Sequence, residues 1–186
     1  MKIGLFFGSF SPMHMGHLAI AQYMVDYTEI ERVLFVVSPK NPLKDESKLW
    51  DKDLRLELAR YSIFDNEDFG VTDIEFDLPV PSYTYDTLRE IRNEDAQNEF
   101  SIIMGSDSLD SLDKWKEYEA LLEENKFFVY TRPGHEKPKF GDHKNVTLVK
   151  SMLLEISSTT IRQKIKKGRS VKYLVRDEVY DMIVEK

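Results

Sequence analysis

The sequence contains no cysteine. This absence excludes a disulfide framework, a zinc site built on thiolates and a cysteine nucleophile. The chain also has no apolar run of the roughly 18 to 20 residues that a membrane-spanning helix needs, and no cleavage pattern follows its short apolar N-terminal run. We therefore expect a cytoplasmic protein that makes no contact with a membrane.

Positive charge is also in deficit. The 26 lysine and arginine residues stand against 33 acidic ones, which gives a formal net charge of −7. A general affinity for nucleic acid or for an anionic membrane is therefore not expected, and an anionic ligand would have to be held by a local site. A hydrophobic share of 41% with 12% aromatic residues is too high for a disordered chain, so the protein folds.

The pattern of apolar residues predicts one α/β domain over residues 1–186. Short runs rich in Val, Ile and Phe have the length of buried strands, and longer amphipathic segments lie between them. The expected strands are 2–7, 32–37, 69–76, 100–105, 126–131 and 145–150, and the expected helices are 17–27, 52–63, 84–94 and 118–125. Such alternation predicts a doubly wound, Rossmann-like open parallel sheet, with two C-terminal helices joined at Gly168 packing on the same core.

The end of the first strand is the first candidate site. In an open parallel sheet, ligands bind outside the carboxyl ends of the strands, and "GSFSPMHMGHL" (8–18) leads from such an end into a helix. Glycine and a helix N-terminus suit a phosphate, but the spacing matches neither the dinucleotide nor the P-loop pattern. His14 and His17, at i and i+3, project to the same side of a first helical turn and can donate hydrogen bonds to phosphate. Zinc is disfavoured because no third ligand lies nearby.

A second candidate is "ISSTTIR" (156–162), near the C-terminus. Ser157, Ser158 and Thr159 suit a helix cap, and the same free N–H groups can bind an anion. Arg162 is the residue that a cap alone does not require.

Together the two stretches resemble the H-x-G-H and I-S-S-T-x-I-R motifs of the nucleotidylyltransferase superfamily, whose members join a nucleoside triphosphate to a phosphate-bearing acceptor and release pyrophosphate. Here Ser9 replaces a second glycine and Ser11 stands where aspartate is usual. The resemblance implies that ATP is bound by Gly8, Ser9, Phe10, His17, Gly105, Asp107, Ser157, Ser158, Thr159 and Arg162.

Three further stretches resemble the nicotinate-nucleotide adenylyltransferase family in particular. They are "PKNPLK" (39–44), "PSYTYDTL" (81–88) and "GSDSL" (105–109) with Trp115 downstream. The resemblance implies that nicotinate mononucleotide is bound by Thr84, Tyr85, Trp115 and Lys44, and that Asp107 lies by a ribose or a metal-bound phosphate. Each position also has a structural interpretation: Trp115 as helix packing, residues 82–86 as a capping box, and Lys44 as a solvated loop residue.

The implied reaction needs no general base. A phosphate monoester is largely dianionic at neutral pH, so the acceptor phosphate can attack the α-phosphate of ATP directly and in line. His14, His17, Lys44 and Arg162 are the expected catalytic residues, and Mg²⁺ accompanies ATP without a dedicated protein site. A nicotinamide-nucleotide or phosphopantetheine adenylyltransferase and a non-catalytic ATP-binding regulatory module are the alternatives. An RNA-acting synthetase fragment would need a basic surface that the charge does not supply. Assembly into a homo-oligomer stays open.

Overall fold

The computed structural model describes residues 1–40, 49–150 and 155–184. Within these ranges the chain forms a six-stranded sheet of order β3-β2-β1-β4-β5-β6, in which every neighbouring pair is parallel. The strands are β1 (Lys2–Gly8), β2 (Arg32–Val37), β3 (Phe69–Thr72), β4 (Glu99–Gly105), β5 (Lys126–Tyr130) and β6 (Val146–Val149). The predicted doubly wound sheet is confirmed, and strand order reverses between β1 and β4.

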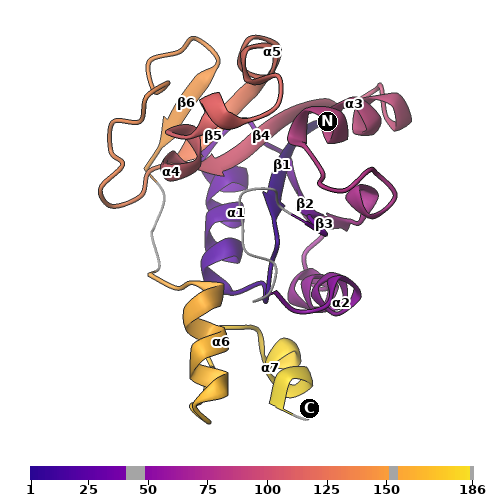
Figure 1. Ribbon diagram of the computed structural model, residues 1–186, viewed down its shortest axis with the longest axis vertical. Coiled ribbons are helices and arrows are strands. Elements are labelled where there is room, and N and C mark those ends of the chain that lie inside the picture. Colours follow the sequence, from indigo (N-terminus) through magenta and orange to yellow (C-terminus); the bar gives the residue numbers. More distant parts are fainter. Residues whose placement is uncertain (41–48, 151–154, 185–186) are drawn as a thin grey trace.

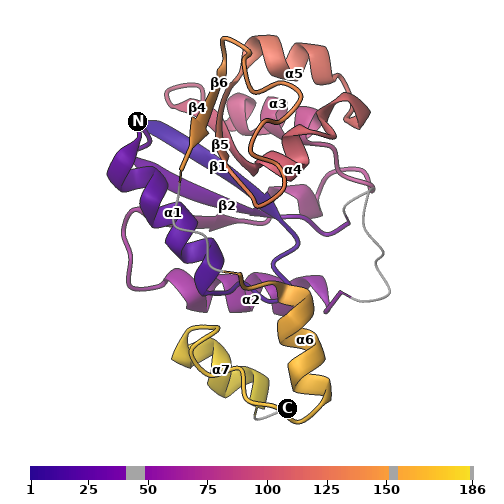
Figure 2. The same cartoon turned by 90° about the vertical axis from the view of Figure 1, so that its left-hand side faces the viewer.

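Helices cover both faces of the sheet, as Figure 2 shows for α1 on one side and α3 and α5 on the other. The helices are α1 (Met15–Tyr27), α2 (Lys52–Ile63), α3 (Thr84–Glu94), α4 (Ser106–Leu109), α5 (Tyr118–Glu124), α6 (Ser158–Lys166) and α7 (Asp177–Val184). Because a sheet covered on both faces buries every strand position, β1, β2 and β4 read as nearly continuous apolar runs. No helix among the described residues is both long and apolar enough to cross a membrane.

The two C-terminal helices lie together beside α2 (Figure 1). They share a small apolar cluster with it, in which Leu58 of α2 meets Ile161 of α6 and Val179 of α7, all three fully buried. Gly168 adopts a φ of +62° just after α6, a conformation that glycine tolerates well. The predicted pair of helices is therefore present, although eight further residues of turn and extended chain separate Gly168 from α7.

One predicted strand is wrong in part. The run 69–76 forms a strand only as far as Thr72, and a 3-10 helix, η2 (Ile74–Phe76), follows. The Thr72 hydroxyl accepts a hydrogen bond from the Ile74 N–H at 3.2 Å, which turns the chain. Glu75 is thereby buried, with its Oε1 accepting a hydrogen bond from the Thr87 hydroxyl at 2.9 Å. An alternating pattern cannot distinguish this turn from four more strand residues.

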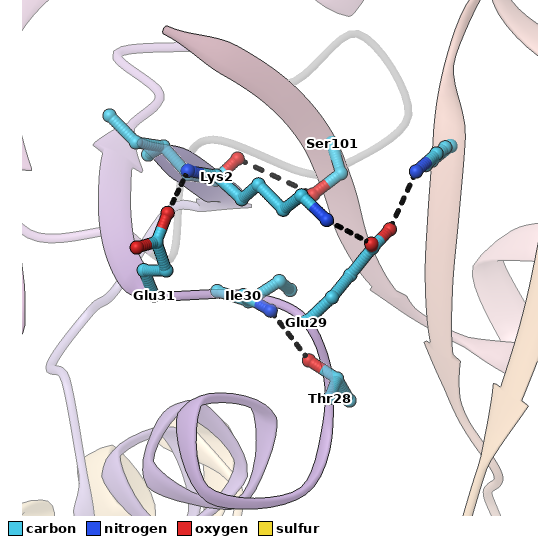
Figure 3. Close-up of polar contacts among 8 residues, drawn as sticks. Lys2, Thr28, Glu29, Ile30, Glu31 and Ser101 are labelled. Atoms are coloured by element: carbon cyan, nitrogen blue, oxygen red, sulfur yellow. Dashed lines mark hydrogen bonds and ion pairs between the residues drawn. The ribbon is translucent and has the colours of Figure 1, made fainter.

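Ion pairs link chain segments at the end of the sheet where the strands begin (Figure 3). Glu29, in the turn before β2, accepts from Lys2 Nζ of β1 at 2.5 Å and from Lys126 Nζ of β5 at 2.6 Å. Hydrogen bonds from Lys126 and then from Lys2 lower the pKa of Glu29 to about 2. This network does not reach the opposite end of the sheet, where the strands finish and the cleft lies.

Candidate active site

A cleft of about 920 Å³ opens at the carboxyl ends of β1 and β4, where the strand order reverses. Ligands of open parallel sheets bind at this position. The cleft is lined by residues that the sequence singled out, from both ends of the chain: Gly8, Ser9, Phe10, His14, His17, Thr84, Gly105, Asp107, Trp115, Ser157, Ser158, Thr159 and Arg162.

The two histidines form a stacked pair at the start of α1. Their ring centroids lie 3.7 Å apart at an interplanar angle of 21°, and the His14 N–H donates to His17 Nδ1 at 3.2 Å. The helix thus starts at Met15, two residues before the predicted position, because the His17 side chain caps it. Burial, and secondarily the charge of Arg132, lowers the pKa of His14 to about 4, so its ring is neutral at pH 7.

The loop between β1 and α1 is held in an uncommon conformation. Phe10 has a φ of +43°, which costs a non-glycine residue about 1 to 2 kcal/mol. Its buried ring makes edge-to-face contacts with Phe6, His17 and Phe35. A Cβ on Gly8 would lie 2.6 Å from this ring, so Gly8 is needed for the ring to pack here.

The C-terminal motif meets this loop directly. Arg162 Nη1 donates to the Ser11 carbonyl at 2.6 Å, and the Ser158 hydroxyl donates to the Pro12 carbonyl at 2.8 Å. Ser157 caps α6 by accepting from the Thr160 N–H at 3.1 Å. Capping and proximity to the cleft are therefore both realised, and residues about 150 positions apart share one pocket.

Ser11 braces the loop in a way that its sequence position does not reveal. Its hydroxyl accepts a hydrogen bond from the Trp50 N–H at 2.9 Å, just before α2. The side chain is buried, so the bond is shielded from water. Serine can therefore anchor the loop at the position where aspartate is usual.

Arg132, which the sequence analysis did not single out, is a further cation of the cleft. It follows β5, and its Nε lies 3.2 Å from Asp107 Oδ1 while its Nη2 donates to the Tyr130 hydroxyl at 3.1 Å. A Cβ on Gly105 would lie 2.4 Å from Asp107 Oδ1 and 2.9 Å from Arg132 Nε. Arg132 could have been found from its position just after β5, a strand that lies beside β4, because ligands bind at the ends of such strands.

The other half of the cleft lies along the start of α3. Thr84 is the first residue of this helix and lines the cleft with Tyr83, Trp115 and Lys116. Tyr85 differs from the prediction: it is not among the residues that line the cleft, and its half-buried ring packs against the core. One residue along a helix rotates a side chain by about 100°. Lys44 lies outside the described residues.

Polar atoms without a partner concentrate in the cleft. Eight buried side-chain atoms of the described residues have no hydrogen-bond partner, and six of them belong to residues that line it. They are Ser9 Oγ, His14 Nδ1, Glu75 Oε2, Ser82 Oγ, Asp107 Oδ1 and Trp115 Nε1. Asp107 Oδ1 still forms the ion pair with Arg132, so the other five are the unpaired atoms. An unpaired buried polar group destabilises the folded state by about 1 to 3 kcal/mol, so a polar ligand that satisfied several would be favoured.

A doubly wound sheet with a histidine pair and a distant Ser-Ser-Thr-x-x-Arg helix start around one cleft defines a nucleotidylyltransferase. The cytidylyltransferase-like family model matches residues 5–164 of the chain. A curated relative from Cytophaga hutchinsonii, named "Probable nicotinate-nucleotide adenylyltransferase", is 44% identical over 186 residues, which is 100% of this chain and 97% of that one. One of the same name from Bacteroides fragilis is 41% identical over 184 residues, covering 99% and 92%.

The chain therefore belongs to the nicotinate-nucleotide adenylyltransferase family, within the cytidylyltransferase-like class. The nicotinic acid mononucleotide adenylyltransferase of Plasmodium falciparum, solved in complex with NaAD, has the same fold with a TM-score of 0.82 at 22% identity, covering 99% of this chain and 95% of that one. The family and enzyme class expected from the sequence are confirmed.

Proposed function

We propose that this chain transfers the adenylyl group of ATP to nicotinate mononucleotide, forming nicotinate adenine dinucleotide and pyrophosphate, by direct in-line attack without a covalent enzyme intermediate. The observation that carries the proposal is the meeting of the two phosphate motifs, in which Arg162 Nη1 lies 2.6 Å from the Ser11 carbonyl. Membership of the family supports this reaction, and the lining of the cleft supports the assignment of residues to it.

In this proposal ATP lies along the carboxyl ends of β1, β4 and β5. Its phosphates lie between the His14–His17 pair and the N-terminus of α6, where Arg162 and unpaired N–H groups favour negative charge. Asp107, in α4 just after β4, lines the same cleft, and its carboxylate can accept hydrogen bonds from the ribose hydroxyls.

Nicotinate mononucleotide occupies the half of the cleft along α3. The N-terminus of this helix, at Thr84, offers backbone N–H groups to the pyridine carboxylate, and Trp115 offers a face on which the ring can stack. Trp115 Nε1 is buried without a partner, so it can donate to the acceptor. Lys44 remains a sequence-based prediction for contact with phosphate.

The chemistry requires alignment and stabilisation of charge. The acceptor phosphate is its own nucleophile, with a second pKa near 6, so no base is needed. Neutral His14 carries one ring N–H that can donate to the α-phosphate or to the leaving pyrophosphate. His17 is stacked on it at the same wall of the cleft, and Arg162 and Arg132 neutralise the charge that develops. Loss of one such contact corresponds to a factor of roughly 10² to 10³ in rate.

Mg²⁺ would enter as the complex with ATP. Within residues 1–40, 49–150 and 155–184 no group of three or more His, Cys, Asp or Glu side chains is arranged to hold a metal. In this proposal the ligands of the ion are phosphate oxygens and waters. When bound, Mg²⁺ would neutralise phosphate charge.

The test is a pyrophosphate-release assay with ATP and Mg²⁺, run in parallel with nicotinate mononucleotide, nicotinamide mononucleotide and phosphopantetheine. The proposal expects the highest kcat/KM for nicotinate mononucleotide. A preference for either other acceptor would contradict the assignment, and ATP binding without pyrophosphate release from any acceptor would indicate a regulatory module.

The same assay tests the role of Arg162. We expect R162M to lower kcat/KM by roughly 10² to 10³, since it removes a charge from the phosphate site. R169M is the matched control, because Arg169 is exposed in the turn after α6 and does not line the cleft. Equal activity of R162M and R169M would refute the role.

A further inference from the structure

Arg55 is the largest fully buried side chain of the described residues, with 1% of its surface exposed. It lies in α2, and within the described part of the chain its hydrogen bonds go to backbone carbonyls. Nε donates to Trp50 at 2.9 Å, Nη1 donates to Ser9 at 2.6 Å and to Ser38 at 2.8 Å, and Nη2 donates to Pro39 at 3.0 Å.

A buried guanidinium whose hydrogen bonds, among the residues that the structure describes, all go to carbonyls is an unfavourable choice for a core position. Removing the charge from water opposes folding, and hydrogen bonds to carbonyls offset only part of that penalty. A Leu or Met of similar volume would fill the space at less cost. The presence of Arg55 at this position is therefore better explained by the geometry that it fixes than by stability.

The geometry concerns three chain segments at the cleft. Ser9 belongs to the loop after β1, Ser38 and Pro39 to the segment after β2, and Trp50 to the segment just before α2. A single planar guanidinium joins them, because its donors diverge in a fixed fork. Ser9 and Ser38 both line the cleft, so the position of Arg55 sets the position of part of its wall.

The bond to Ser9 fixes the direction of the next N–H. The Ser9–Phe10 peptide is trans, so when its carbonyl points to Arg55 the Phe10 N–H points the opposite way, away from α2. Phe10 itself has the left-handed φ of +43°, which bends the loop back. No acceptor for the Phe10 N–H is found in the described part of the chain.

We infer that Arg55 is a positioning residue for the triphosphate: it holds the Ser9–Phe10 peptide so that the Phe10 N–H faces the ATP phosphates. This inference rests on the proposed function of the cleft. Arg55 contacts backbone carbonyls behind the loop, so it acts through the loop and touches no reacting atom.

The test compares R55M and R55K with the parent and with R92M. Arg92 is a matched control because it is a half-buried arginine on α3 whose Nη2 donates to Asn125 Oδ1 at 2.6 Å, away from the cleft. Affinities for ATP, inorganic tripolyphosphate and adenosine are measured by calorimetry. We expect both Arg55 variants to bind ATP and tripolyphosphate about tenfold or more weakly and adenosine within about twofold of the parent, a loss of 1.4 kcal/mol or more that is confined to phosphate.

A lysine cannot reproduce four diverging contacts, so R55K should fail as R55M does. A purely structural role predicts that the folded fraction of each variant binds all three ligands as the parent does, and that result would overturn the inference. Should the variants not fold, the parent still decides: the Phe10 amide resonance must shift strongly on titration with tripolyphosphate, and an unmoved resonance overturns the inference. Because these readouts need no acceptor, they are independent of the turnover assay that tests the proposed function.

Discussion

Protonation of His14 should make folding stability depend on pH. The pKa of this buried imidazole is lowered from 6.5 to about 4, first by burial and then by the charge of Arg132. The folded state therefore binds fewer protons than the unfolded chain between these values, and its stability falls as the pH drops from 6.5 toward 4. The charged or titratable groups that face His14 are Arg132 and the stacked ring of His17.

The size of the effect follows from the pKa difference. One unit of pKa difference corresponds to about 1.36 kcal/mol. The difference between the folded and unfolded pKa values of His14 therefore lowers the unfolding free energy by about 2.5 kcal/mol when the pH falls from 7.5 to 4.5. H14Q has no titrating ring, so its stability should lack this component. Carboxylates such as Glu29 and Glu75 also change stability in acid, but both proteins contain them, and they cancel when the two are compared.

Urea unfolding followed by tryptophan fluorescence at pH 7.5, 6.5, 5.5 and 4.5 measures the difference. The parent should lose about 2.5 kcal/mol more than H14Q over this range, with most of the divergence below pH 6.5. Parallel curves for the two proteins would refute the claim that the His14 ring is buried and neutral. A parent that lost less stability than H14Q would reverse the sign and refute it more strongly.

Three further predictions concern single positions. H17A should lower kcat by roughly 10² to 10³ in the pyrophosphate assay, because the ring can donate to developing phosphate charge; turnover within tenfold of the parent would contradict this role. L58A should reduce the unfolding free energy by about 2 to 5 kcal/mol in urea titrations, since this fully buried side chain joins α2 to the C-terminal helices, and a loss under 1 kcal/mol would show that the cluster collapses around the cavity. G105A should raise the KM for ATP about tenfold with the acceptor KM nearly unchanged, because its Cβ would displace Asp107 and Arg132; an unchanged KM for ATP would contradict the placement of ribose and phosphate beside them.

Much of the fold could be predicted from local patterns. The strand 32–37 and the helices 52–63 and 84–94 have the predicted bounds. These segments are bounded by clear signals: Asp51 caps α2 by accepting from the N–H groups of Asp53 and Leu54, and dense apolar runs mark strands buried on both faces. Where the hydrophobic period, the capping residue and the length of a segment agree, its bounds can be predicted without knowing what it packs against.

The remaining features depend on contacts between distant segments. Arg55 interrupts the apolar face of α2, and nothing near it in sequence indicates that carbonyls from three segments converge on it. Arg132 becomes a cleft residue only because β5 lies beside β4. Glu75 reads as a strand residue until Thr87 is seen to donate to it. The motif residues, in contrast, could be placed because both phosphate motifs begin helices at the carboxyl edge of the sheet.

Phe10 belongs to two environments at once. Its ring is an apolar neighbour of Phe6 and Phe35, and the same residue lines the cleft that we propose to bind ATP. A change in the packing around the Phe10 ring would therefore also move a residue that lines the cleft. Attempts to make this protein more heat-resistant by refilling its interior around Phe6 and Phe35 should therefore alter nucleotide affinity as well.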